Sequence, residues 1–235
     1  MHGWDAQNRG VPLDRAAFVH AHLRVEPVPF VPELSLYQAE EPVGLWELTE
    51  GEYRSDQPPP FWAFAWAGGQ GLARYVLDHP SLVTGETVLD LASGSGLVAI
   101  AAARAGAASV RAVEIEPMAA AAVTLNASVN GVAVDVAIDD VLDHGEADAS
   151  VVLAGDVFYS KQMAARVLTF LRRAARRGAN VLVGDPGRAY FPGEYFTAVR
   201  SYEVPVRYEL ESAHVRTVTV WRINPGGAAA GFSKK

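Results

Sequence analysis

Short apolar runs, many of them β-branched, alternate with helical patterns from residue 87 to residue 184, and this alternation restricts the fold more than any other feature. The runs predicted as strands are 87–91, 109–114, 132–138, 150–154 and 180–184. Among the segments between these strands, the ones predicted as helices are 97–105, 117–130 and 161–177. Strands joined by helices pair in parallel through right-handed crossovers. The sequence therefore predicts a doubly wound α/β fold with a mostly parallel sheet.

Two further strand-like runs, 202–210 and 215–223, follow near the C-terminal end and are separated by only a few residues. A gap this short allows a hairpin but leaves no room for a crossover helix, so one of the two strands must run antiparallel. With the five preceding strands, they predict a seven-stranded sheet with an antiparallel C-terminal strand. The small and polar residues 226–235 are expected to form a disordered tail.

The first 60 residues lack this alternation. Asp14 can cap a short helix that ends near Leu23, after which prolines at 27, 29, 32 and 42 interrupt every periodic pattern. Large apolar residues remain frequent in this region, among them Leu45 and Trp46, and such residues are usually buried. We therefore expect residues 1–60 to be an N-terminal extension packed on the core, followed by one domain over 61–225.

Composition excludes several classes of function. The net charge is −7 and the lysines are Lys161, Lys234 and Lys235, so no broad positive field attracts nucleic acid. The chain has no cysteine, which excludes disulfides, thiolate zinc sites and iron–sulfur clusters. His20 and His22 point to different sides of a helix, so no metal site is expected. No spanning segment or signal peptide is recognisable, so we expect no membrane partner and a cytoplasmic location.

The segment Val88-Leu89-Asp90-Leu91-Ala92-Ser93-Gly94-Ser95-Gly96 combines the end of a strand, a glycine turn and a helix start. Gly94 and Gly96 let the backbone approach a ligand, and Glu114, at the end of the next strand, can accept hydrogen bonds from both hydroxyls of a ribose. Asp90 suits the positively charged amino group of a methionine moiety. Together these residues predict a nucleoside site.

The glycines also match the glycine-x-glycine-x-x-alanine fingerprint of dinucleotide enzymes, so an NAD-dependent oxidoreductase remains an alternative. The polar Asp90 and Ser93 before the first glycine, and the terminal antiparallel pair, favour the other interpretation. A third interpretation of these glycines is a tight βα turn that binds no ligand.

The segment from Asp90 to Gly96, together with Glu114 and the antiparallel pair, resembles the class I, seven-strand S-adenosylmethionine-dependent methyltransferases. The segment Gly155-Asp156-Val157-Phe158-Tyr159 resembles the Asp-x-x-Phe/Tyr signature of the lysine methyltransferases in this class. Together with residues 31–34, 61–69 and 184–188, it makes the chain similar, over about residues 25 to 223, to bacterial relatives of the electron transfer flavoprotein β-subunit lysine methyltransferase. Ala92 departs from the glycine usual in the wider class.

The resemblance implies S-adenosylmethionine as cofactor, S-adenosylhomocysteine as its product and a protein substrate, the β-subunit of electron transfer flavoprotein. A small-molecule N- or O-methyltransferase remains an alternative. The absence of an Asn-Pro-Pro-Tyr motif argues against base methylation.

The resemblance also implies roles for individual residues. The catalytic residues would be Asp156 and Tyr159, with Asp156 orienting the lysine. The residues expected to bind the cofactor are Trp66, Asp90, Ser93, Gly94, Gly96, Glu114, Asp140 and Gly155. The residues expected to line the substrate are Phe61, Trp62, Phe158, Asp185 and Arg188.

Each of these assignments has a plainer alternative. Asp156 could cap the helix that starts near Ser160. Asp140 could be a solvated turn acid, and the clustered aromatic residues could be ordinary core. Asp185 and Arg188 could pair with each other or simply form a turn.

Overall fold

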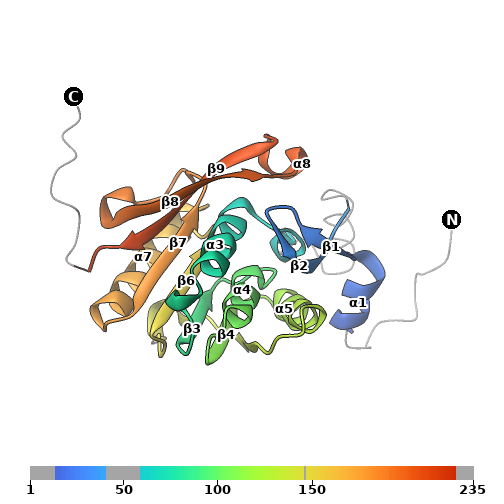
Figure 1. Ribbon diagram of the computed structural model, residues 1–235, viewed down its shortest axis with the longest axis horizontal. Helices are drawn as coiled ribbons and strands as arrows, with labels where there is room; N and C mark the ends of the chain where they lie inside the picture. The colour runs from blue at the N-terminus through green and yellow to red at the C-terminus, as the bar shows by residue number, and fades with distance from the viewer. Residues whose placement is uncertain (1–13, 41–58, 146, 226–235) are drawn as a thin grey trace.

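The computed structural model describes residues 14–40, 59–145 and 147–225. Within these residues, one seven-stranded sheet has the order β5-β4-β3-β6-β7-β9-β8 (Figure 1). Its strands are β3 Thr87–Leu91, β4 Ser109–Glu114, β5 Asp135–Ile138, β6 Val151–Gly155, β7 Asn180–Asp185, β8 Phe196–Pro205 and β9 Val215–Ile223. Strands β3 to β7 pair in parallel, and β9 is antiparallel to both β7 and β8. The predicted fold class is therefore confirmed.

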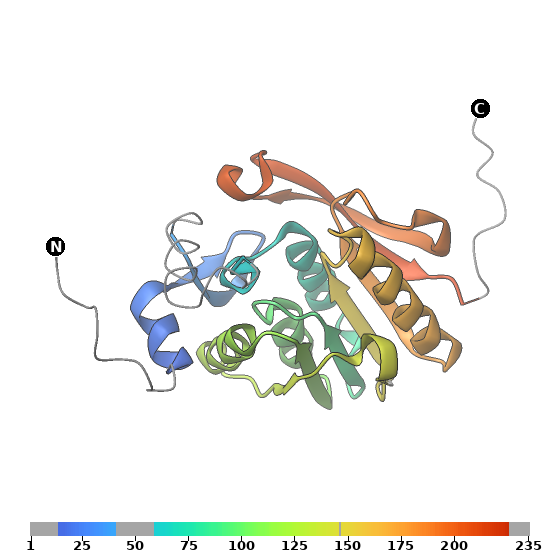
Figure 2. The same cartoon turned by 180° about the vertical axis from the view of Figure 1, so that it is seen from behind.

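Helices cover both faces of this sheet. They are α3 Ala67–Asp78, α4 Leu97–Arg104, α5 Pro117–Val129, α6 Val141–His144 and α7 Lys161–Arg176. One face carries α3, α4 and α5, which pack on strand residues such as Val151 and Leu153 (Figure 1). The other face carries α7, which packs on Val152 and Ala154 (Figure 2). Successive residues of β6 thus serve opposite faces, because side chains alternate along a strand, and both faces are apolar, as a parallel sheet requires.

The hairpin at the C-terminal end differs from the prediction in its first strand. Strand β8 begins at Phe196 rather than at residue 202, and Tyr208–Glu211 forms the short helix α8 instead of continuing the strand. Strand β8 is the edge strand of the sheet and most of its residues are at least partly exposed, so its apolar pattern is weak. Pairing with β9 ends at Pro205.

The described part of the N-terminal region is more regular than its prolines indicate. Helix α1 (Arg15–His22) begins as predicted, since the Asp14 carboxylate accepts a hydrogen bond from the Ala17 amide over 3.1 Å. Strands β1 (Arg24–Val28) and β2 (Val31–Gln38) then form an antiparallel hairpin, so the prolines do not interrupt all regular structure. Pro27 lies where the register shifts, a place in a two-stranded sheet that tolerates the loss of an amide donor.

The hairpin and α1 pack beside α5 (Figure 1). Asn126 of α5 and Asn130, the C-cap of this helix, bind the backbone of β2: the Tyr37 amide donates to Asn126 Oδ1 over 2.7 Å and the Ser35 amide to Asn130 Oδ1 over 3.0 Å. The expectations for Leu45, Trp46 and the tail 226–235 concern residues outside the described part of the chain. No helix among the described residues is long and apolar enough to cross a membrane.

Candidate active site

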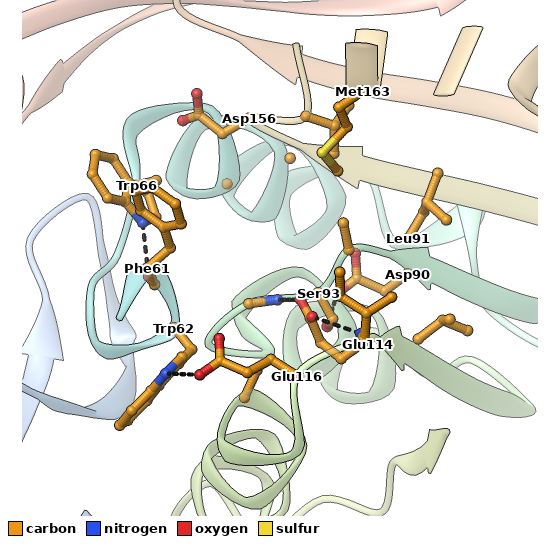
Figure 3. A pocket seen from close by; sticks show the side chains of 18 of the residues that line it. Phe61, Trp62, Trp66, Asp90, Leu91, Ser93, Glu114, Glu116, Asp156 and Met163 are labelled. Carbon is orange, nitrogen blue, oxygen red and sulfur yellow. Dashed lines mark hydrogen bonds between the residues drawn. The ribbon is translucent and has the colours of Figure 1, made fainter. Parts of the chain in front are cut away.

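A cavity of about 570 Å³ opens at the carboxyl ends of β3, β4 and β6, beneath the aromatic segment that precedes α3 (Figure 3). Open α/β sheets bind ligands at this edge, and the volume is in the range of small-molecule sites. The predicted residues that line it are Phe61, Trp62, Trp66, Asp90, Ser93, Gly94, Glu114, Asp140, Gly155, Asp156, Tyr159 and Arg188. Among the predicted residues, Gly96, Phe158 and Asp185 do not line it.

The glycine turn forms the floor on the β3–β4 side. Gly94 has a φ of 56°, which favours glycine, and the space where its side chain would project is open. Its amide donates a hydrogen bond to Glu114 Oε1 over 2.6 Å, while Glu114 Oε2 accepts one from the Ile115 amide over 3.0 Å. Burial raises the pKa of Glu114, and these two hydrogen bonds oppose the rise. A partly buried carboxylate thus stands beside an open stretch of backbone.

Gly96 packs against α5 and does not line the cavity, and its predicted role in cofactor binding stays a prediction. With a φ of 81°, it is the N-cap of α4, and a Cβ there would lie 2.9 Å from Val123 Cγ1 on α5. The glycine therefore lets α5 approach the turn closely.

Asp90 anchors the turn from inside the sheet. Its Oδ2 accepts hydrogen bonds from the Ser93 hydroxyl over 2.5 Å and from the Ala99 amide over 3.0 Å. Asp90 is almost fully buried, and burial raises its pKa to about 7. The residue therefore holds the shape of the turn as well as contributing to the cavity lining.

Asp156 lies at the other side of the cavity, directly after β6. Its φ of 61° is a strained value for a residue with a side chain, and such strain is typical of functional sites. Oδ2 accepts a hydrogen bond from the Gly68 amide over 2.6 Å, and Oδ1 accepts one from Arg188 Nε over 2.5 Å. Burial raises the pKa of Asp156, and the Arg188 guanidinium lowers it.

The alternative that Asp156 caps the following helix is not what the structure shows. Ser160 is the N-cap of α7, and its hydroxyl accepts a hydrogen bond from the Met163 amide over 3.2 Å. The Asp156 carboxylate bonds the first turn of α3 instead, which has no hydrogen bond from the side chain of its own N-cap residue. It is held in place by a helix far away in the sequence.

Aromatic side chains form the wall above Asp156. The Trp66 indole donates to the Phe61 carbonyl over 2.8 Å, and the Phe61 ring lies 5.7 Å from both the Trp66 and the Tyr159 ring. Phe61 and Tyr159 are 39% and 50% exposed, so they reach from the cavity to the surface. Trp62 and Phe64 are buried yet also line the cavity, so these rings serve core and site together.

Phe158 was predicted to line the substrate, but it is a core residue. It is fully buried and its ring packs 5.4 Å from Phe191 and 6.0 Å from Phe196. The left-handed turn at Asp156 directs the chain so that Tyr159, not Phe158, faces the cavity.

Asp185 and Arg188 form a turn, and their side chains do not pair. Asp185 Oδ1 accepts hydrogen bonds from the backbone amides of Gly187 and Arg188 over 2.7 and 2.8 Å. Asp140 caps α6 and binds Arg166 over 2.9 Å, while still lining the cavity.

Several lining residues were missed by the sequence analysis. Glu116 accepts a hydrogen bond from the Trp62 indole over 3.0 Å, and burial raises its pKa to about 7. Its position before Pro117, at the start of a helix and two residues after Glu114, was a usable signal. Ile115, Met163 and Arg166 also line the cavity, and for Met163 and Arg166 the sequence carried no distinguishing pattern.

These residues fit a nucleoside-containing cofactor that carries a positive charge. Glu114 and the open backbone at Gly94 suit a ribose, and the carboxylates of the lining outnumber its two arginines, Arg166 and Arg188. Glu114 ends β4 and Asp156 directly follows β6, and these two strands lie on either side of β3, so about 10 Å separates the two ends of the site. No group of three His, Cys, Asp or Glu residues suited to a metal occurs in the described segments.

Comparison with known proteins shows which proteins this chain is similar to. The family model described as "Ribosomal protein L11 methyltransferase (PrmA)" matches residues 75–165. The electron transfer flavoprotein beta subunit lysine methyltransferase of Mus musculus is 37% identical over 172 residues, which cover 71% of this chain and 68% of that protein. The Xenopus laevis protein of the same name is 32% identical over 215 residues, covering 89% and 87%.

A solved structure agrees in fold. A Pyrococcus horikoshii protein described as an RNA methyltransferase has a TM-score of 0.51 at 16% identity, covering 81% of this chain and 98% of that chain. At this identity the likeness concerns the fold alone.

The fold, the match to the methyltransferase family model and the named relatives together define a class I, seven-strand methyltransferase that uses S-adenosylmethionine. The predicted enzyme class and cofactor are confirmed, and the dinucleotide alternative is set aside. The identity to relatives over more than two thirds of their length is specific enough to go further. The chain belongs to the family of electron transfer flavoprotein β-subunit lysine methyltransferases.

Proposed function

We propose that this enzyme methylates a lysine side chain of a protein, and that this protein is the β-subunit of electron transfer flavoprotein. The family supports the choice of substrate, because the relatives carry it in their names. The observation that carries the proposal is the buried carboxylate of Asp156 at the cavity edge, beneath aromatic rings that reach the surface. A long side chain that ends in an amine matches this combination.

The residues of this chain prepare the amine for transfer. The cofactor, when bound, supplies an electrophilic methyl group on a sulfonium. A lysine amine is protonated in water, so the site must favour its neutral form and align it. The Asp156 carboxylate accepts hydrogen bonds from the amine and orients it, while the low-polarity wall of Phe61, Trp66 and Tyr159 favours the uncharged state. Holding the nucleophile close and in line is the main requirement of such a displacement.

The two ends of the site have separate tasks. Glu114 faces the glycine turn and serves the nucleoside, whereas Asp156 lies beyond β3 and serves the nucleophile. The match to the ribosomal protein L11 methyltransferase model ends at residue 165, before Arg188 and the C-terminal hairpin. The matched range includes Glu114 and Asp156, so it covers both ends of the site but not Arg188.

Methylation of purified substrates tests the proposal. Electron transfer flavoprotein and ribosomal protein L11 from the same source are incubated separately with the enzyme and radiolabelled S-adenosylmethionine, and mass spectrometry then locates the methyl group. We expect label on a lysine of the flavoprotein β-subunit, none on L11, and none with Asp156→Asn. Label on L11 alone, or only on small molecules of a cell extract, would refute the proposed substrate.

A further inference from the structure

Arg188 lies in the wall of the cavity with all three nitrogens of its guanidinium engaged. Nε binds Asp156 Oδ1 over 2.5 Å, and Nη1 and Nη2 bind the two oxygens of Glu211 over 3.0 and 2.8 Å. The guanidinium also lies 5.8 Å from the centre of the Trp66 ring. A bidentate arginine–carboxylate pair fixes the plane of the guanidinium, so its third nitrogen points in one direction.

The backbone of Arg188 is held independently of its side chain. Asp185 ends β7, is almost fully buried, and accepts the amides of Gly187 and Arg188 with one oxygen. Gly187 has a φ of 85°, which allows this tight turn. The strand end therefore determines where the Arg188 side chain starts, and Glu211 determines where it ends.

Glu211 belongs to the connection between β8 and β9, not to the parallel sheet. It is the last residue of α8, and its side chain is 2% exposed. Arg216 is its second partner, with Nε 3.6 Å from Oε2 and Nη2 hydrogen-bonded to the Glu211 carbonyl. A buried carboxylate with two cations is a fixed anchor, since leaving it unpaired would be costly.

We infer that Arg188 is a positioning residue for methyl transfer: it fixes the Asp156 carboxylate toward the cavity, and Glu211 fixes Arg188. The inference rests on the proposed role of Asp156. A terminal carboxylate rotates freely about its last torsion unless its oxygens are engaged. The Gly68 amide engages Oδ2 and Arg188 engages Oδ1. An ionised carboxylate has about four acceptor positions, so about two remain for the amine.

The surrounding charges match a cationic substrate. The carboxylates of this cluster are Asp156, Asp185 and Glu211, and its guanidiniums are Arg188 and Arg216. The cluster holds three carboxyl groups and two guanidiniums, an excess of acid that attracts a lysine side chain as it arrives, before its ammonium group loses a proton. Burial raises the pKa of Asp156, the Arg188 guanidinium lowers it, and the Glu211 carboxylate raises it further.

Titration of Asp156 tests the inference without any substrate. Protein with ¹³C-labelled aspartate carboxyl groups is followed by NMR across pH, and the Asp156 signal is assigned as the one missing from Asp156→Asn. In Arg188→Gln, the pKa of Asp156 should rise by about one to three pH units, because an opposite charge is lost. In Glu211→Gln, the pKa of Asp156 should fall or remain unchanged, because a like charge is lost. No rise in a folded Arg188→Gln protein would overturn the inference.

Arg74 provides a matched control. Its side chain is 19% exposed, against 22% for Arg188, and it also binds two carboxylates, Glu33 and Asp78, but outside the cavity. Arg74→Gln should leave the Asp156 titration unchanged, and an equal rise in this variant would contradict a specific effect of Arg188. If Arg188→Gln does not fold, the double variant with Glu211→Gln removes both members of the pair and should show a smaller rise in the Asp156 pKa, because the loss of the like charge partly offsets the loss of the opposite one.

Activity then separates positioning from charge. With the protein substrate identified by the methylation assay, the acid limb of the pH profile of kcat/KM should move to higher pH in Arg188→Gln. Arg188→Lys keeps the charge but cannot bind both carboxylates in the same plane, so the limb should stay while kcat falls by about tenfold or more. Full activity of Arg188→Lys would overturn the claim that the guanidinium fixes the orientation of the Asp156 carboxylate. Failure of the wild-type enzyme on the flavoprotein would refute the proposed substrate, yet would leave the NMR result standing.

Discussion

Two neighbouring glycines at the start of α3 should respond in opposite ways to the same substitution. A Cβ on Gly68 would collide with the Gly184 carbonyl oxygen and lie 2.9 Å from both the amide and Oδ2 of Asp156. All but one of these atoms are backbone, so they cannot move without shifting α3 or the ends of β6 and β7. A Cβ on Gly69 would meet nothing nearer than Val98 Cγ2 at 4.0 Å, an ordinary contact.

The energies follow from these contacts. Overpacking a fixed site costs about 1–3 kcal/mol, whereas replacing glycine by alanine inside a helix contributes about 0.5–1 kcal/mol. Gly68→Ala should therefore lower the free energy of unfolding, and Gly69→Ala should raise it by up to about 1 kcal/mol. For a protein of this size, each kcal/mol corresponds to roughly 2–4 °C in Tm.

Activity should follow the Asp156 contact. The Gly68 amide holds Asp156 Oδ2, so displacing α3 misplaces the carboxylate, and a 1 Å misplacement can cost about a hundredfold in rate. Urea unfolding and kcat are measured for both variants, with the Kd of S-adenosylhomocysteine as a check on Glu114, which lies on β4. If Gly68→Ala were as stable and as active as the wild type, the close approach of α3 to β6 and β7 would be wrong.

Two further predictions concern the carboxylates of the cavity. Asp156→Ala should keep cofactor affinity within about tenfold of the wild type while abolishing methyl transfer, whereas Glu114→Ala should lose cofactor affinity first. Calorimetric titration with the cofactor distinguishes the two variants. An equal loss of affinity in both would contradict the separate roles of Asp156 and Glu114. For Glu116, burial raises the pKa from an ordinary 4.5 to about 7. Between pH 4.5 and 7 the native state therefore holds more protons than the unfolded state, so the free energy of unfolding falls as pH rises through this range. Glu116→Gln keeps an acceptor for the Trp62 indole and should make Tm fall less steeply as pH rises, which calorimetry at several pH values measures. An unchanged dependence of Tm on pH would be evidence against the raised pKa of Glu116.

The sequence predicted most of the sheet because its parallel strands are buried on both faces. The bounds predicted for 87–91 and 109–114 agree with β3 and β4 residue for residue. The prediction failed for β8, an edge strand without a continuous apolar run, and missed β1 and β2, where prolines hide a hairpin. The local sequence pattern says little about strands that are stabilised mainly by pairing with a neighbouring strand.

For the candidate site, sequence predicted which strand ends carry acids but not how the side chains are directed. Phe158 and Tyr159 are adjacent in a signature motif, yet Phe158 is fully buried in the core and Tyr159 lines the cavity, a difference that the motif does not indicate. The partnership of Arg188 with Glu211 joins residues 23 positions apart across a hairpin, which no local spacing reveals. Such contacts depend on the tertiary arrangement, so they become visible only in the folded structure.

Asn126 makes the N-terminal hairpin a working part of the cofactor site. This buried amide accepts a hydrogen bond from the Tyr37 backbone with its oxygen and donates one from its nitrogen to the Ser95 carbonyl, inside the glycine turn, over 2.8 Å. An enzyme shortened to begin at the aromatic segment would lose the donor to the Asn126 oxygen and would uncover an asparagine that is buried in the whole protein. The hairpin is therefore no removable appendage, and a minimal catalytic fragment of this protein has to include it.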